Sequence, residues 1–389
     1  MNHSVYIHIP FCHEICHYCD FAKMFYNELL ADDYLIHLEA EMKMYLGEKK
    51  IKPKTVYVGG GTPTSLTPNQ LEKFLKIIHR FIHIEDVEEF TIEANPGQFS
   101  SEHVTIMKSY GINRVSLGVQ VLDDEYLKQL NRNHTVLDVD RSVKILQKND
   151  IKNISMDFIY ALPNQTLQHF ENTLINALTY DLPHYSSYAL QIEPRTVFYI
   201  RHQQGKLNKP PEDEEAQMYL SLIEIMEKHN KKHYEISNFA EKGFESKHNL
   251  TYWNNEYYYA FGAGASGYLS DERYVNVRPV NHYIKAIAEN KKPILNREKL
   301  TLKDKIEEEM FLGLRIMDGV SDTKFKEKYS ISFFNLYEKQ IEDQIEKGYL
   351  IRERDRIRLT EKGMLFGNDV FAAFLLDEGE LERFVAIDS

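Results

Sequence analysis

The residues that decide the fold lie near the start of the chain, at positions 5–21, and read VYIHIPFCHEICHYCDF. An apolar run that ends at Pro10 leads into a loop with the spacing Cys-x3-Cys-x2-Cys, formed by Cys12, Cys16 and Cys19. These are the only 3 cysteines among 389 residues, which excludes a disulfide framework for a chain of this length. Clustered thiols in a reducing compartment are typically metal ligands or redox groups. The loop therefore predicts a metal or redox site directly after the first strand.

Outward from this loop, short β-branched and aromatic runs alternate with amphipathic segments as far as about residue 190. The predicted strands cover residues 5–9, 55–58, 89–93, 114–119, 154–159 and 185–190, and the helical segments include 34–46, 70–81 and 139–148. This regular succession of strand and helix indicates βαβ units and a parallel sheet. Six such units favour an α/β fold with a partial (β/α)6 barrel over a closed eight-stranded barrel.

Polar and glycine-rich residues gather at the carboxyl ends of these strands. The cysteine loop follows the first strand, Gly59-Gly60-Gly61-Thr62 follows the second, and Glu93, Gln120 and Asp157 lie at the ends of later strands. Barrel enzymes collect their chemistry on this rim, which favours a barrel over a doubly wound sheet. The glycine turn lacks the Gly-Lys-Ser/Thr ending of a phosphate-cradling loop, which argues against a nucleotide triphosphatase.

Three regions are predicted: the barrel with its cysteine loop over residues 1–205, a barrel-associated segment over 206–300, and a smaller α+β domain over 301–389. In the last region a hairpin at 349–351 and 356–359 follows helical segments and resembles a winged helix. Residues 321–389 carry 11 basic against 15 acidic side chains and the whole chain has a net charge of −12, so no nucleic-acid partner is expected. The chain has no apolar run near the membrane-spanning length of about 20 residues and no amino-terminal secretory pattern. A cytoplasmic protein is therefore expected.

Two kinds of metal site are compatible with the cysteine loop. A structural zinc site needs four protein ligands, and His13 or His17 could supply the fourth. A 4Fe–4S cube usually takes four thiolates, so three thiolates would leave one iron open. An open iron can chelate the amino and carboxylate groups of S-adenosylmethionine and pass an electron into its sulfonium, which generates a 5′-deoxyadenosyl radical.

The loop resembles the signature of the radical S-adenosylmethionine superfamily, whose members carry this spacing after the first strand of a partial barrel. Further motifs narrow the resemblance: Gly59-Gly60-Gly61-Thr62-Pro63-Thr64, Glu93-Ala94-Asn95-Pro96-Gly97, Arg114-Val115-Ser116-Leu117-Gly118-Val119-Gln120, Arg132-Asn133-His134 and Met156-Asp157-Phe158. Together they resemble the oxygen-independent coproporphyrinogen III oxidase family and its close relatives, over nearly the whole chain.

The resemblance implies a 4Fe–4S cluster held by Cys12, Cys16 and Cys19, with bound S-adenosylmethionine. It places two tyrosines beside the cofactor and a set of polar and glycine residues along its site: Tyr6, Tyr18, Gly60, Gly61, Thr62, Glu93, Gln120, Arg132 and Asp157. The chemistry suits these roles, because carboxylates and amides can hold ribose hydroxyls and an ammonium, and an arginine can pair with a carboxylate. Each of these polar residues taken alone would be read as an ordinary hydrogen-bonding residue of a barrel rim.

The sequence departs from the decarboxylating oxidases of this family in three ways. Those enzymes carry a fourth cysteine two residues after the third, where this chain has Phe21. They also carry an extension before the cluster strand, which we expect to be missing here because the strand begins at about Ser4. The third difference is a gained motif, His-Asn-x-x-Tyr-Trp, within the stretch 247–253. This motif resembles that of HemW-type proteins, which are described as haem chaperones.

The gained motif implies a haem site formed by His248, Asn249, Tyr252 and Trp253. Imidazole is a common axial ligand of haem iron, and tyrosine and tryptophan offer broad apolar faces to a flat macrocycle. A Tyr-Trp pair that simply packs a core is the alternative. The motif leaves open whether His248 is the iron ligand, an attachment point or a wall of the site.

Two functions of different classes follow. The first is a haem chaperone that carries the cluster and S-adenosylmethionine and delivers haem to an acceptor protein, which could be membrane-bound. The second is an oxygen-independent coproporphyrinogen III oxidase, which decarboxylates propionate side chains to form protoporphyrinogen IX. Phe21 and the His248 motif favour the first. A radical enzyme acting on another substrate is a third hypothesis, and an electron donor such as a flavodoxin or ferredoxin is the expected partner of such chemistry.

Overall fold

The computed structural model describes residues 3–381 and residue 384, and these form two compact units. The barrel unit contains the chain up to Lys232 together with Phe239–His248 and Tyr257–Glu298. The carboxy-terminal unit contains His233–Asn238, Asn249–Glu256 and the chain from Lys299 onward. The chain passes between the units at β9 (Lys232–Glu235), β10 (Asn238–Ala240), α9 (Lys247–Trp253) and β14 (Ile294–Lys299), and near residue 256.

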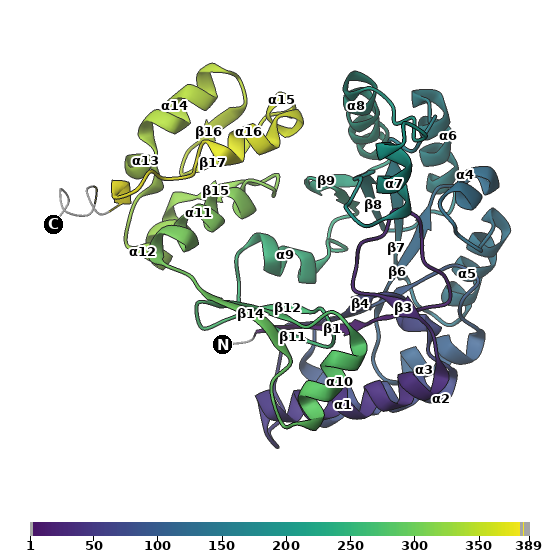
Figure 1. Ribbon diagram of the computed structural model, residues 1–389. Coiled ribbons are helices and arrows are strands. Elements are labelled where there is room, and N and C mark those ends of the chain that lie inside the picture. The colour runs from purple at the N-terminus through teal and green to yellow at the C-terminus, as the bar shows by residue number, and fades with distance from the viewer. Residues whose placement is uncertain (1–2, 382–383, 385–389) are drawn as a thin grey trace. The chain divides into compact units, whose positions relative to one another are not determined.

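All six predicted strands are present in the barrel unit. They are β1 (Ser4–Ile9), β4 (Thr55–Gly60), β5 (Glu89–Ala94), β6 (Arg114–Gln120), β7 (Asn153–Tyr160) and β8 (His184–Ala189), joined in this order and all parallel. Their interiors are almost entirely buried, as expected for strands covered on both faces. The predicted α/β fold with an open, partial barrel is therefore confirmed (Figure 1).

The sheet also extends past β1, which the sequence did not predict. There β11 (Tyr258–Phe261) pairs with β1 in parallel, and β12 (Ser266–Leu269), β13 (Glu272–Asn276) and β14 follow in the sheet order. The strand β11 overlaps the aromatic run 257–259. It is difficult to predict from the sequence because it has only four residues and Gly262 follows it directly. As a result the carboxyl end of β11 reaches the same edge of the sheet as the cysteine loop.

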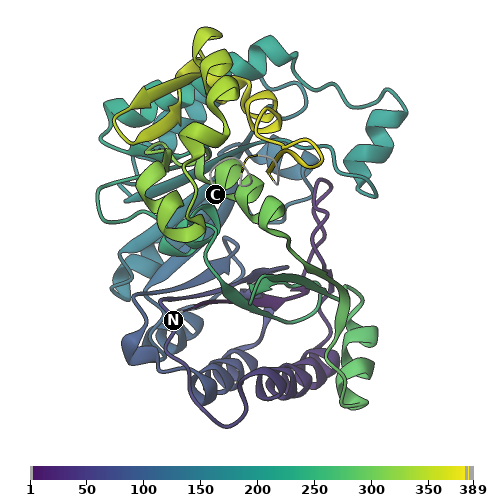
Figure 2. The same cartoon turned by 90° about the vertical axis from the view of Figure 1, so that its left-hand side faces the viewer.

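Helices return the chain from each strand to the next, and Figures 1 and 2 show α1 and its neighbours along the outside of the strands. Their bounds are α1 (Glu28–Leu46), α2 (Pro68–Phe81), α3 (Ser101–Ser109), α4 (Asp124–Gln129), α5 (Val136–Lys148), α6 (Leu167–Leu178), α7 (Val197–Gln203), α8 (Glu212–Lys228) and α10 (Val280–Ala288), with 3-10 turns η1 (Pro63–Ser65) and η2 (Ile84–Asp86). Side-chain caps fix several starts: Thr67 and Gln70 form a capping box at α2, and Ser100 and His103 form one at α3.

The carboxy-terminal unit is built around a small sheet with the order β15-β17-β16 (Figure 1). Its elements are α11 (Leu302–Gly313), β15 (Val320–Ser321), α12 (Asp322–Tyr329), α13 (Phe333–Leu336), α14 (Glu338–Glu346), β16 (Leu350–Glu353), β17 (Arg356–Leu359), α15 (Glu361–Leu365) and α16 (Gly367–Ala372). The predicted hairpin is present as β16 and β17. Buried apolar side chains such as Ile306, Phe325 and Ile357 form a separate core for this unit.

The described helices include none with the combined length and apolarity that a membrane crossing requires.

Candidate functional site

The cysteine loop is closed at its base by two short strands, β2 (Phe11–Cys12) and β3 (Met24–Phe25), which pair in parallel. The backbone N–H of Met24 donates to the Pro10 carbonyl at 2.8 Å, and that of Tyr26 donates to the Cys12 carbonyl at 2.8 Å. This closure holds the intervening residues as a defined loop at the carboxyl end of β1.

Each thiol of the loop has a polar neighbour. The Thr62 hydroxyl donates to Cys12 Sγ at 3.7 Å, and Arg132 Nη1 donates to Cys16 Sγ at 3.4 Å. Cys19 lies near the Lys23 ammonium, whose positive charge opposes the rise that burial causes in the pKa of this thiol. Burial raises the pKa of Cys12 to about 12. Positive charge or a metal is therefore needed to hold Cys12 and Cys19 as thiolates.

The spacing of the thiols fits a multi-iron cluster better than a single zinc ion. Two thiolates on one zinc lie only about 4 Å apart, because each Zn–S bond is about 2.3 Å long. Among residues 3–381 and 384, the three Cys Sγ atoms do not all lie within 4.8 Å of one another, nor does a set that joins them to a histidine. His17 Nδ1 instead bonds the Gln129 carbonyl at 2.8 Å. His17 is thus engaged elsewhere, and three thiolates suit a 4Fe–4S cube that keeps one iron open.

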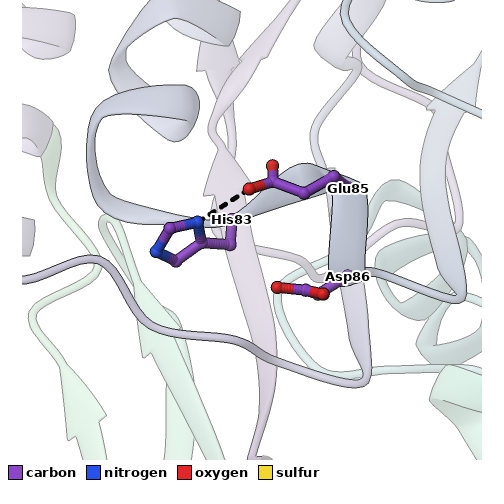
Figure 3. Close-up of side chains that lie close together, drawn as sticks. All are labelled: His83, Glu85 and Asp86. Carbon is purple, nitrogen blue, oxygen red and sulfur yellow. Dashed lines mark hydrogen bonds and ion pairs between the residues drawn. The ribbon is translucent and has the colours of Figure 1, made fainter.

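A histidine and two carboxylates do lie within 4.8 Å of one another at the opposite edge of the sheet: His83, Glu85 and Asp86 (Figure 3). They belong to the η2 turn just before β5, and the two carboxylates are exposed. His83 Nδ1 bonds Glu85 Oε1 at 2.8 Å, and Lys52 pairs with Asp86 at 3.0 Å. These local contacts account for the cluster without a bound ion.

The glycine turn at the end of β4 packs closely against β1 and the cysteine loop. A Cβ on Gly61 would lie 2.9 Å from Cys12 Sγ and 2.8 Å from the Phe11 carbonyl oxygen. Gly60 has φ of +115°, and a Cβ there would lie 2.6 Å from the His8 ring. A side chain at either position would therefore clash with β1 or with the cysteine loop, which explains why glycine is needed here.

Glu93, at the end of β5, faces the glycine turn. Its carboxylate accepts hydrogen bonds from the Tyr57 hydroxyl at 2.8 Å and from the Gly60 N–H at 3.1 Å. Burial raises the pKa of Glu93 to about 7, and the nearby negative charge of Asp157 acts in the same direction. A buried carboxylate of this kind gains from a cationic or hydroxyl-bearing ligand.

Asp157 and Gln120 complete this rim. The Asp157 carboxylate accepts from the Ser116 hydroxyl at 2.8 Å and the Ser155 hydroxyl at 3.0 Å. Gln120 follows an irregularity in the β6–β7 pairing and has φ of +70°, a left-handed conformation unusual for this residue type. Such local strain is often found where a side chain is held toward a site.

Arg132 connects the thiols to the rim. Its Nη2 donates to Asn95 Oδ1 at 2.7 Å and also to the Gly118 carbonyl, while Nη1 donates to Cys16. The Arg132 Nε is buried and has no acceptor among the described residues. Asn95, which was quoted in a motif but not predicted as a site residue, also donates to Thr62 Oγ1 at 2.9 Å. An unused buried donor beside the cysteines fits a ligand carboxylate.

His8 is a second residue that the sequence analysis did not single out. Its ring lies between the Tyr6 hydroxyl, 2.9 Å from Nδ1, and the Ala22 carbonyl, 2.7 Å from Nε2. Burial lowers the pKa of His8 to about 4, so the ring is neutral at pH 7. The neutral imidazole thereby ties β1 to the far side of the cysteine loop, and its place inside the quoted stretch 5–21 was the available signal.

The predicted cluster and cofactor residues therefore meet at one edge of the barrel unit. Tyr6 stacks on Tyr57 at 6.2 Å, and Tyr18 neighbours both Cys16 and Arg132. The glycine turn, Thr62, Glu93 and Gln120 lie at the ends of the adjoining strands, and Asp157 lies within β7. Three thiols, a glycine cradle and an unused arginine donor together form an arrangement that an iron–sulfur cluster and an amino-acid ligand fit.

His248, in contrast, lies at the other end of the strands and is fully buried. Its Nδ1 shares a 2.7 Å hydrogen bond with the hydroxyl of Thr55, the first residue of β4, and its backbone N–H donates to Glu89 at 3.1 Å. The His248 ring stacks on Tyr57 at 5.0 Å. Gly60 lies five residue steps after Thr55 along β4, which puts the two ends about 16 Å apart.

The remaining residues of the predicted haem motif belong to the carboxy-terminal unit. Asn249, Tyr252 and Trp253 continue α9, and all three are half-buried. The guanidinium of Arg315 lies over the Trp253 ring at 4.6 Å. The four motif residues therefore share one short helix, although the helix itself is divided between the two units.

Comparison with known proteins identifies both parts of the chain. Residues 6–175 match the model of the radical SAM superfamily, and residues 300–366 match that of the HemN C-terminal domain. The superfamily implies a 4Fe–4S cluster and S-adenosylmethionine.

Relatives match over almost the whole length. A protein of Bacillus subtilis named heme chaperone HemW is 48% identical over 381 residues, which cover 97% of this chain and 100% of that protein. The protein of the same name from Lactococcus lactis is 46% identical over 96% of this chain and 98% of its own length.

A solved structure shows the same fold. Coproporphyrinogen III oxidase (HemN) from Escherichia coli, described as a radical SAM enzyme, superposes with a TM-score of 0.83 and 21% identity, over 96% of this chain and 89% of that one. At this identity the likeness concerns the fold alone. The full-length relatives carry the closer assignment, and the chain belongs to the HemW family, within the HemN-like branch of the radical SAM superfamily.

Proposed function

We propose that the protein is a haem chaperone that binds haem, a 4Fe–4S cluster and S-adenosylmethionine, and transfers the haem to an acceptor protein. The observation that carries this proposal is the 48% identity to a heme chaperone HemW along that protein's entire length. The His248–Trp253 motif on α9 supports it, because it supplies an imidazole and two aromatic rings within two turns of helix.

The cluster would be held by Cys12, Cys16 and Cys19, and the loop closure at β2 and β3 would keep their spacing. The S-adenosylmethionine site would be lined by Tyr6, Tyr18, Gly60, Gly61, Thr62, Glu93, Gln120, Arg132 and Asp157. When bound together, the cluster and S-adenosylmethionine supply one-electron chemistry. An electron donor such as a flavodoxin or ferredoxin would then be a partner.

The chain's own residues would bind and orient the cofactor. The unused Nε–H of Arg132 would pair with a carboxylate, while Asn95 holds the guanidinium in place from Nη2. Glu93 would accept an ammonium or a hydroxyl, and the hydrogen bonds from Tyr57 and Gly60 fix its orientation. The absence of a side chain at Gly61 would let the turn stay in close contact with the loop that carries Cys12.

His248, Asn249, Tyr252 and Trp253 would take part in the haem site. His248 is fully buried, and its Nδ1 is engaged by Thr55. For its ring to reach a haem iron, the start of α9 must leave this position. A role as an anchor for the motif requires no such movement, and the two roles predict different spectra.

Haem titration of the anaerobically purified protein tests the proposal. We expect the titration to give a saturable Soret shift. The bound haem would then pass to an acceptor protein in the cytoplasm, either soluble or membrane-bound. His248→Ala tests ligation, with His229→Ala as the matched control because His229 is exposed. Loss of the axial-ligand signature in His248→Ala alone supports ligation, and an unchanged spectrum with weaker binding supports the anchor.

The same preparation should be incubated anaerobically with coproporphyrinogen III, an electron donor and S-adenosylmethionine. A chaperone should form no protoporphyrinogen IX under these conditions. Rapid conversion, with no saturable haem binding, would contradict the proposal and favour the oxidase.

A further inference from the structure

Arg315, in the carboxy-terminal unit, carries a guanidinium that no described carboxylate pairs with. It follows α11, and its backbone is fixed at both ends: its N–H donates to the Leu312 carbonyl at 3.1 Å, and its carbonyl accepts from the Ile236 N–H at 3.1 Å. Among the described residues its guanidinium makes no hydrogen bond or ion pair, and its Nε is buried. A buried guanidinium N–H without an acceptor is unusual in a native protein.

Trp253, which lies next to Arg315, also carries a buried N–H donor without an acceptor among the described residues. The Arg315 guanidinium lies over the Trp253 ring at 4.6 Å and within 6.0 Å of the Phe371 ring. The Trp253 Nε1 is also buried and has no acceptor in the described part of the chain. Two N–H donors from stacked side chains thus lie close together without an acceptor.

The positive charge of Arg315 acts on the Glu235 carboxylate and opposes the rise in its pKa, but the two side chains form no ion pair. Its oxygens accept hydrogen bonds from the Ser237 N–H at 3.3 Å and from Asn238 Nδ2. Burial raises the pKa of Glu235 to about 7, so a substantial share of this group is neutral near neutral pH. Among the described residues, Glu235 therefore does not supply the acceptor that these two donors lack.

We propose that the Arg315 Nε–H and the Trp253 Nε1–H form a clamp for a carboxylate, and that its occupant is a propionate of the haem. This inference rests on the proposed function. A carboxylate offers two oxygens, one for each donor, and pairs strongly with a guanidinium. The stacked aromatic rings would also offer an apolar surface to the adjoining macrocycle.

Haem and haem dimethyl ester, whose propionates are esterified, are the two probes that test the clamp. Each is titrated against the wild-type protein, Arg315→Gln, Arg315→Lys and Trp253→Phe, by Soret absorbance. Arg315→Gln should bind haem roughly 10-fold more weakly, as expected for loss of a charge-assisted hydrogen bond. Trp253→Phe keeps the ring and loses the N–H, so a smaller loss is expected. Neither variant should change the affinity for the ester.

Arg352→Gln is the matched control, because Arg352 also stacks on an aromatic ring of this unit, that of Phe334 at 3.8 Å, but is exposed. It should bind both probes as the wild type does. If Arg315→Gln fails to fold, as judged by circular dichroism, Arg315→Lys carries the test, since it keeps the charge without the Nε–H.

The outcomes separate the two proposals. Haem binding that is unchanged in Arg315→Gln, or an equal loss for haem and its ester, overturns the clamp and leaves the chaperone proposal standing. Millimolar acetate should compete with haem and not with its ester, and equal competition against both would overturn the propionate as the occupant. A wild-type protein that binds no haem overturns both.

Discussion

The two ends of the barrel unit differ in how their polar groups are used. At the carboxyl end of the strands, three thiols, a glycine cradle and the unused Arg132 Nε converge on one place. At the amino end, His248 is bonded to Thr55 and to Glu89 and lies wholly inside the barrel. The first end offers groups that a ligand would complete, whereas the second uses its histidine to fix α9 to the strands.

Tyr57 joins these two ends. Its hydroxyl donates to Glu93 at 2.8 Å, and its ring stacks on His248 at 5.0 Å. Tyr57 lies in the middle of β4, between Thr55 and the glycine turn. Tyr57 thus contacts one residue of each end, and a change at one end can be tested for an effect at the other.

Replacing Cys16 should produce the largest effect. Cys16→Ala removes one of three thiolates, and we expect the iron content of anaerobically purified protein to fall from about four atoms per chain to near zero. Iron and sulfide analysis and electron paramagnetic resonance measure this. The control is Thr64→Val, at a buried hydroxyl in the turn after the glycines, which should keep its cluster. An intact 4Fe–4S signal in Cys16→Ala would refute the cluster assignment.

His248→Ala should instead act on stability. It leaves a cavity and removes the hydrogen-bond partner of Thr55, so the free energy of unfolding should fall by about 3 kcal/mol with iron content unchanged. Urea unfolding followed by circular dichroism measures the loss. Fluorescence of Trp253, the chain's single tryptophan, separately reports the carboxy-terminal unit.

His229→Ala, at an exposed position, should cost less than about 0.5 kcal/mol. If the His248→Ala protein is as stable as this control, His248 does not stabilise the packing at the amino ends of the strands. A lower iron content in His248→Ala would show that the two ends are coupled through Tyr57.

The six parallel strands and the rim that they form could be predicted from the sequence, because both depend on local patterns. Strand runs, amphipathic segments and the three clustered cysteines can be recognised within short windows. The carboxyl ends of parallel strands share one edge, so residues as distant as Cys12 and Asp157 could be placed together without coordinates.

Contacts between distant segments could not be predicted in this way. His248 meets Thr55 across 193 positions, and nothing local to the motif shows that its histidine enters the barrel. Trp253 meets Arg315, which lies in no recognisable motif. The strand β11 was missed because its pairing partner is β1, about 250 residues earlier. The domain boundaries at 205 and 300 stay predictions, which limited proteolysis can test.

Gly60 tests the crowding at the carboxyl end. Gly60→Ala and Gly243→Ala both place a side chain at positive φ, +115° and +92°, but a Cβ meets the His8 ring at 2.6 Å in the first and nothing within 4 Å in the second. The His8 ring is held by Tyr6 and Ala22 and cannot withdraw freely. Gly60→Ala should therefore be less stable than Gly243→Ala by about 2 kcal/mol in urea unfolding. Equal losses would mean that backbone strain alone decides.

The smallest expected effect is the pH dependence of stability that arises from His248, at the amino ends of the strands. Burial lowers the pKa of His248 from 6.5 to about 3, so below pH 6.5 the unfolded chain binds a proton that the folded chain does not. Stability is therefore lost as pH falls, by about 1.4 kcal/mol at pH 5.5 from this group. The raised pKa of Glu93, about 7, makes that group lose stability as pH rises. Glu93 is present in both wild type and His248→Gln, so its effect cancels when the two are compared. The difference in unfolding free energy between wild type and His248→Gln should thus shrink from pH 8 to pH 5.5, and a constant difference would show that His248 titrates normally in the folded protein.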